Sequence, residues 1–136
     1  MFNIRYASKE DTSFWFTLDR HINESMFEIK IRDKQVYIIL DGSKPIGVMR
    51  YNLFWDNTPF LTLIALDESY QGKGFGSKAM KCWENEMQKS GYKLIMTSSQ
   101  SNEQAQHFYR KLGYLDSGCL LLKKEPVEIF FVKYFG

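Results

Sequence analysis

Residues 67–77 read Asp-Glu-Ser-Tyr-Gln-Gly-Lys-Gly-Phe-Gly-Ser, a glycine-rich segment between two different apolar patterns. The residues before it, LTLIAL at 61–66, are nearly all apolar, as in a strand that is covered on both faces. After it, apolar side chains recur every four residues, which predicts an amphipathic helix that ends at Gly91. The residues of this stripe are Phe75, Ala79, Trp83 and Met87, with Met80 beside them. The sequence therefore predicts a strand, a glycine-rich turn and a helix in direct succession.

The predicted turn has the features of a phosphate-binding site. Where a helix begins, several backbone N–H groups have no partner and the helix dipole is positive. Gly72, Gly74 and Gly76 allow a ligand to approach the backbone closely, and Lys73 and Lys78 add positive charge. From the residues alone, a flexible glycine loop without a ligand remains the alternative.

Two common phosphate-binding patterns do not fit this turn. The dinucleotide motif has the spacing G-x-G-x-x-G, whereas the glycines here have the spacing G-x-G-x-G. That motif also requires an early strand–helix–strand unit with an acidic residue about 20 positions on, which this sequence lacks. The P-loop ends in Gly-Lys-Ser/Thr, whereas residues 76–78 read Gly-Ser-Lys. A nucleotide-binding protein of either type is therefore disfavoured.

The flanking patterns predict a mixed α/β fold. Residues 93–97 (KLIMT) form the next strand, and a strand–helix–strand unit requires a parallel pair, so the sheet must be mixed. Two helical segments are expected within residues 9–31, capped by Ser8 with Asp11, with a break at 23–25 as an alternative. A later helix runs from a capping box of Ser101 and Gln104 to Gly113. Further strands are expected at 4–7, 35–40, 46–52, 120–122 and 128–134.

The composition is that of one ordinary globular domain, residues 1–136, without linker or repeat. Lys and Arg number 18 against 16 Asp and Glu, and the resulting net charge of +2 predicts no nucleic-acid partner. We expect no signal peptide and no membrane span, and a cytoplasmic location. Cys82 and Cys119 have no metal-ligand spacing and are expected to be buried small side chains, so no metal is predicted.

Gln71, Gly74 and Gly76 match the pattern Q/R-x-x-G-x-G/A, and about 30 residues downstream follow Asn102, Tyr109 and the segment Leu-Gly-Tyr at 112–114. In these two motifs the chain resembles the GNAT (Gcn5-related N-acetyltransferase) superfamily, over residues 46–114. The first third matches only in its pattern of elements. The resemblance implies a mixed, largely antiparallel sheet of six to seven strands, about four flanking helices, and a splayed central parallel pair.

The resemblance also implies a site for acetyl-coenzyme A. The main chain of Ile64, Ala65 and Leu66 would pair with the pantetheine arm, and the Leu66 amide would polarise the thioester carbonyl. Asn102 would bind the pantetheine from the other wall, and Tyr109 would protonate the departing thiolate. The diphosphate would be held by the backbone amides of Gln71, Gly72, Lys73, Gly74, Phe75 and Gly76 and by the Ser77 hydroxyl.

A general base is not evident, because LTLIAL and KLIMT contain no carboxylate where many relatives carry a Glu. Glu24, Asp67, Glu68 and Glu128 are the candidates, and we expect proton removal through water instead. His21 and His107 are expected to be surface residues.

The resemblance implies transfer of an acetyl group to a primary amine. Phe54, Trp55 and Phe60 flank the turn before the central strand and, with Glu24, are the acceptor-side candidates. An aromatic pocket favours a small amine or amino acid over a basic protein tail. Acetylation of a protein N-terminus or lysine, and a non-catalytic acyl-coenzyme A-binding regulatory module, remain alternatives. The strand EIFFVKY at 128–134 could pair with a second copy to form a homodimer.

Overall fold

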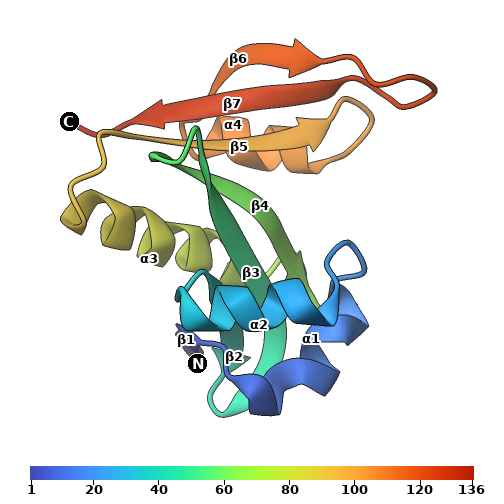
Figure 1. Cartoon of the computed structure of the whole chain (residues 1–136), viewed down its shortest axis with the longest axis vertical. Coiled ribbons are helices and arrows are strands. Elements are labelled where there is room, and N and C mark those ends of the chain that lie inside the picture. Colours follow the sequence, from blue (N-terminus) through green and yellow to red (C-terminus); the bar gives the residue numbers. More distant parts are fainter. The chain divides into compact units, whose positions relative to one another are not determined.

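The computed structural model describes residues 1–136 and contains seven strands and four α-helices, with two short 3-10 helices (Figure 1). The elements follow in the order β1 (Phe2–Tyr6), η1 (Lys9–Asp11), α1 (Thr12–Leu18), α2 (Glu24–Arg32), β2 (Val36–Asp41), β3 (Lys44–Phe54), β4 (Thr58–Leu66), η2 (Glu68–Tyr70), α3 (Phe75–Lys89), β5 (Leu94–Gln100), α4 (Ala105–Lys111), β6 (Leu115–Leu120) and β7 (Glu128–Tyr134). None of the helices is long and apolar enough to cross a membrane.

The strands form one sheet in the order β1-β2-β3-β4-β5-β7-β6. Strands β4 and β5 are parallel, whereas β1–β2, β2–β3, β5–β7 and β6–β7 are antiparallel. The parallel register contains only two pairs, Phe60 with Met96 and Leu61 with Thr97. The predicted mixed sheet with a central parallel pair is confirmed.

The chain divides into two compact units. The first unit comprises residues 1–52 and 62–83, and its core lies between α1, α2 and the strands β2 and β3. The fully buried side chains there include Trp15, Phe27, Val36, Ile38 and Val48. The second unit comprises residues 53–61 and 84–136, in which α4 packs beside β5 and β7 (Figure 1). That the chain is a single domain stays a prediction.

A buried ion pair joins α1 to β3 in the first unit. Arg50 on β3 donates from Nε to the Asp19 carboxylate at 2.8 Å, and the Trp15 indole donates to the same carboxylate oxygen at 3.1 Å. The His21 amide donates to the other carboxylate oxygen at 3.0 Å. Asp19 is fully buried, so these donors compensate a charge that would otherwise be costly to bury. These hydrogen bonds fix Asp19 at the end of α1 and the first residues of the α1–α2 loop.

Several local predictions are confirmed. Ser8 and Asp11 form a capping box at η1, and the Ser8 amide donates to the Asp11 carboxylate at 2.8 Å. The region after Asp11 contains two helices, and Asn23 caps the second by accepting from the Met26 amide at 2.8 Å. The α3 stripe is buried at Ala79, Met80, Trp83 and Met87.

Two predicted element boundaries are wrong. The strand expected at 120–122 is β6, Leu115–Leu120, because the earlier segment pairs with β7. This pairing contains a register shift between Asp116 and Gly118. The capping box of Ser101 and Gln104 does not form, and α4 begins at Ala105 without a side-chain cap. Residues 101–104 form turns instead, in which the Glu103 carboxylate accepts from the Gln100 amide at 2.8 Å.

The expectation that both cysteines are buried is also wrong, since Cys82 and Cys119 are exposed. Cys82 lies on α3 away from the buried stripe, and Cys119 lies on β6, where every residue is exposed. Position on an element decided exposure here, and residue type did not.

Candidate functional site

The glycine-rich turn lies in the first unit, between the end of β4 and the start of α3. The Asp67 carboxylate accepts from the Ser69 amide at 3.3 Å and so begins the turn. The Gln71 side chain donates from Nε2 to the Leu66 carbonyl at 3.2 Å. The side chain of Gln71 therefore links the turn to Leu66, the last residue of β4.

The glycines of the turn are required by the backbone, not by packing. Gly72 and Gly74 have φ angles of 74° and 90°, in the left-handed region that side chains disfavour. A Cβ atom at either position would meet no protein atom within 4 Å. The approach to the backbone is thus open on this side, which fits a ligand that binds main-chain amides.

The amides at the start of α3 complete this arrangement. The first main-chain hydrogen bond of the helix runs from the Lys78 amide to the Gly74 carbonyl at 3.2 Å. The amides of Phe75, Gly76 and Ser77 therefore precede the helical ladder. Lys73 and Lys44 both lie near the Tyr70 ring, at 5.7 and 5.3 Å from its centre. Donors and positive charge occur together, as a diphosphate requires.

Gly47 packs against the candidate site and was not singled out by the sequence analysis. A Cβ atom on this residue of β3 would lie 2.5 Å from Leu66 Cδ2 and 3.0 Å from the Ala65 carbonyl oxygen. The absence of a side chain there lets β3 approach the β4 segment that contains both residues. A lone glycine inside a strand was the signal that could have found it.

Tyr109 lies in the second unit, on α4, and its side chain is largely buried. Its ring packs against the rings of Phe131 at 5.9 Å and Tyr114 at 5.8 Å. Burial raises the pKa of the Tyr109 phenol above its usual 10.0, the polar side chain of Thr97 lowers it, and the nearby Glu103 and Glu128 raise it further. The phenol is therefore protonated at neutral pH and able to donate.

The ring of Tyr114 is held in place by ion-paired groups of the second unit. Its hydroxyl donates to the Glu84 carboxylate at 2.7 Å, and Lys133 donates to the other oxygen of that carboxylate at 2.9 Å. Lys133 also donates to the Leu112 carbonyl at 2.8 Å. The predicted Leu-Gly-Tyr segment thus supports the last turn of α4.

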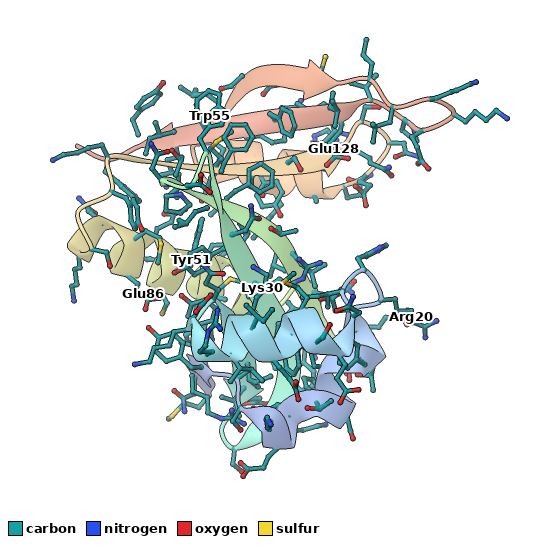
Figure 2. The ribbon with its side chains drawn as sticks, viewed as in Figure 1. Arg20, Lys30, Tyr51, Trp55, Glu86 and Glu128 are labelled. Atoms are coloured by element: carbon teal, nitrogen blue, oxygen red, sulfur yellow. The ribbon has the colours of Figure 1, made fainter.

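The remaining candidates occupy varied positions. Asn102 is exposed in the turn before α4, and Glu24 is the exposed first residue of α2. Glu128 begins β7 and is half-buried (Figure 2). His21 and His107 are exposed, as expected. No group of three or more His, Cys, Asp or Glu side chains is placed to hold a metal ion.

The aromatic acceptor candidates lie together around the β3–β4 hairpin. The Phe54 ring packs against Trp55 at 4.7 Å and Phe60 at 6.2 Å, and Phe60 packs against Phe130 at 6.0 Å. Trp55 is 79% exposed at the hairpin tip, with a φ of 57° (Figure 2). Since β4 and β5 are parallel, this tip lies toward the amino end of β5, and Thr97 lies further along the strand. An acceptor role for Phe54 and Trp55 stays a prediction.

Solved structures of acetyltransferases share this fold. A GNAT-family acetyltransferase from Bacillus cereus is 24% identical, with 98% of this chain and 97% of that chain covered at a TM-score of 0.79. A putative streptothricin acetyltransferase from Bacillus anthracis, in complex with acetyl coenzyme A, is 18% identical, with 100% and 98% covered at 0.85. The ribosomal-protein-S18-alanine N-acetyltransferase from Escherichia coli is 17% identical, with 97% and 92% covered at 0.79.

No curated protein matches the chain in sequence. The family described as "Acetyltransferase (GNAT) family" does match, over residues 3–114, and this range contains the glycine-rich turn, Asn102 and Tyr109. The match covers most of the chain and agrees with the sheet order and with the position of the turn between β4 and α3. The chain belongs to the acetyltransferase (GNAT) family.

Proposed function

We propose that the protein is an N-acetyltransferase that moves an acetyl group from acetyl-coenzyme A to a primary amine. The observation that carries the proposal is the open glycine-rich turn at the start of α3, in which Gly72 and Gly74 have positive φ and no protein atom lies where their side chains would be. In an enzyme of this family, such a turn suits the diphosphate of the cosubstrate.

The residues proposed to bind acetyl-coenzyme A lie at the end of β4, in the glycine-rich turn and before α4. The main chain of Ile64, Ala65 and Leu66 pairs with the pantetheine arm, and Gly47 gives this segment its close fit to β3. Asn102 binds the pantetheine as well. The diphosphate accepts from the amides of Gly72, Lys73, Gly74, Phe75 and Gly76 and from the Ser77 hydroxyl. The Gln71 amide, also expected to bind it, already donates to the Glu68 carbonyl at 3.3 Å.

The proposed reaction is direct transfer. The neutral amine nitrogen attacks the thioester carbon, the C–N bond forms, and the C–S bond then breaks. The sulfur takes its proton from the Tyr109 phenol, and the excess proton of the new amide nitrogen leaves through water. A Lys-like amine is only about 0.04% neutral at pH 7 and an α-amine about 14%, so the latter needs less help from a base. The Leu66 amide stabilises the negative charge on the carbonyl oxygen.

We propose a small amine or an amino acid as the acceptor, with Phe54, Trp55 and Glu24 as candidate contacts. The relatives include one named for a ribosomal protein's alanine and one for streptothricin, so both protein and small-molecule acceptors occur on this fold. Acetylation of a protein N-terminus or lysine is the alternative.

Formation of a homodimer also remains a proposal, but the predicted pairing of β7 with a second copy of the chain is wrong. Both edges of β7 are already paired, one with β5 and the other with β6. The free strand edge of the second unit therefore belongs to β6.

Incubation with acetyl-coenzyme A and a panel of amines tests the activity. We expect release of the free thiol, measured with a thiol-reactive dye, together with a mass increase of one acetyl group on the acceptor. The panel should contain small amines, amino acids and peptides with free N-termini or lysines. Binding of coenzyme A without thiol release for any amine would instead favour a non-catalytic acyl-coenzyme A-binding module.

The water route for proton removal makes a separate prediction. Changing Glu24, Asp67, Glu68 or Glu128 singly to its amide should leave kcat within about tenfold, because no single carboxylate is the base. Steady-state rates of the four variants check this. A loss of about a thousandfold at one position would identify that carboxylate as the base.

A further inference from the structure

Arg50 is a buried guanidinium whose hydrogen-bond donors are only partly used. Its side chain is 9% exposed, and its Nε donates to the Asp19 carboxylate at 2.8 Å. The two terminal nitrogens, Nη1 and Nη2, have no acceptor within the chain. Since a guanidinium has five N–H groups, four of them remain available to a ligand.

The terminal nitrogens of Arg50 are not sealed from solvent. The Trp83 indole nitrogen is the one side-chain nitrogen or oxygen that lacks both a hydrogen-bond partner and contact with solvent. Because Nη1 and Nη2 of Arg50 also lack a partner, they must retain some accessible surface. A small solute can therefore contact them.

A second buried cation lies next to Arg50. Lys30 on α2 is 8% exposed, and its ammonium donates at 2.8 Å to the carbonyl of Tyr51, the residue after Arg50 on β3 (Figure 2). Its other acceptor is the side-chain oxygen of Gln35 at 3.1 Å, so neither partner carries a negative charge. An ammonium has three N–H groups, and one of these therefore remains available as well.

The two cations share a single carboxylate, that of Asp19. Asp33, the other acidic group near Lys30, is exposed and pairs with Arg32 at 3.0 Å. Burial lowers the pKa of Lys30 and the charge of Arg50 lowers it further, while Asp33 raises it. The buried groups thus carry one more positive than negative charge, which is costly unless an anion binds there.

We propose that Arg50 and Lys30 form a subsite for the carboxylate of the acceptor, so that the acceptor is an amino acid and not an amine without a carboxylate. The two terminal nitrogens of a guanidinium match the two oxygens of a carboxylate, and the ammonium adds a further charged donor. The inference rests on the proposed acetyltransferase activity and specifies the class of its acceptor.

The subsite belongs to the same unit as the segment proposed to bind the thioester. Residues 64–66 on β4 and Arg50 on β3 both lie in the first unit. Gly47, which packs against Leu66, precedes Arg50 by three residues, or about 10 Å along the strand. A small amino acid and an arginine side chain together are of comparable length. The amine can therefore reach the thioester while the carboxylate contacts Arg50.

Acetylation of matched acceptors tests the inference. Amino acids with increasing separation of amine and carboxylate, from glycine to 6-aminohexanoate, are compared with the corresponding carboxamides. For at least one length, we expect kcat/KM of the acid to exceed that of its carboxamide at least about tenfold, because the amide lacks the charge that Arg50 and Lys30 bind.

Two substitutions probe the two cations separately. Lys30→Met removes the ammonium without touching the Arg50–Asp19 pair, whereas Arg50→Lys keeps a positive charge for Asp19 but loses the planar pair of terminal nitrogens. Each should lower the acid-to-carboxamide ratio of kcat/KM roughly tenfold, with the KM for acetyl-coenzyme A within about twofold. The control is Arg20→Gln, which removes an exposed cation from the loop after α1 and should leave the ratio unchanged (Figure 2).

Thermal unfolding shows whether each variant folds. Lys30→Met decides the test if Arg50→Lys does not fold, and Lys30→Gln, which keeps a donor for the Tyr51 carbonyl, replaces Lys30→Met if that variant fails. Equal kcat/KM for acid and carboxamide at every length, or an unchanged ratio in the Lys30 variant, would overturn the inference while the acetyltransferase activity stood. Absence of thiol release with every amine would instead overturn the proposed function, and the acceptor subsite with it.

Discussion

Replacement of Tyr109 by Phe should lower kcat at least about tenfold, while the affinity for acetyl-coenzyme A stays within a few-fold. The change removes only the phenolic oxygen and keeps the ring that packs against Phe131 and Tyr114. The loss should therefore fall on the step in which the thiolate departs. Steady-state kinetics and calorimetric titration with coenzyme A measure the two quantities separately.

The matched control is Tyr134→Phe, the same chemical change at a tyrosine that is 66% exposed on β7. It should leave both quantities unchanged. If Tyr109→Phe turned over as fast as the parent, Tyr109 would not be the acid, and water or another group would protonate the thiolate.

The pH dependence follows from the same residue. The pKa of Tyr109 is raised above 10.0, mainly by burial, and the acid is active in its protonated form. Tyr109 can therefore act as the general acid at pH values below this pKa, and this activity is lost as the pH rises through it. Loss of activity below about pH 10 in the parent would have to come from another group.

The second large effect concerns the cosubstrate. Gly74→Val should weaken coenzyme A binding at least about tenfold, because the side chain would occupy the open approach to the turn and the φ of 90° is strained for valine. The amides of Phe75 and Gly76 would then no longer be accessible to a diphosphate in the same geometry. Isothermal titration with coenzyme A checks this.

Gly42→Val provides the control for backbone strain. Gly42 also has a positive φ, 62°, and a Cβ atom there would meet no protein atom within 4 Å, but this glycine lies in the β2–β3 turn. We expect both variants to lose similar stability on thermal unfolding, of about 1 kcal/mol, and only Gly74→Val to lose binding. Parent-like binding by Gly74→Val would remove the diphosphate from this turn.

Local patterns predicted most of the elements because each depends on neighbours along the chain. The four-residue spacing of Ala79, Trp83 and Met87 makes an apolar stripe whatever covers it, and these residues are buried as predicted. The strand–helix–strand order around residues 67–77 required a parallel pair, which β4 and β5 form.

The predictions were wrong where pairing between distant segments of the chain determines the structure. The expected strand at 120–122 is displaced because β6 takes its register from β7, and Cys119 is exposed because β6 is at the sheet edge. The proposed dimer contact through β7 failed for the same reason, since its partners β5 and β6 come from other parts of the chain. No local pattern contains this information.

The candidate site divides in the same way. The glycine-rich turn is read directly from residues 71–76, because positive φ and helix-start amides are properties of a short segment. The place of Phe131 beside Tyr109, and of Gly47 against Leu66, depends on strand register and on the packing of α4, which bring together residues far apart in sequence. Sequence thus determined the chemistry of the turn, whereas tertiary structure decided which side chains surround the proposed acid, because hydrogen bonds and burial depend on distance in space.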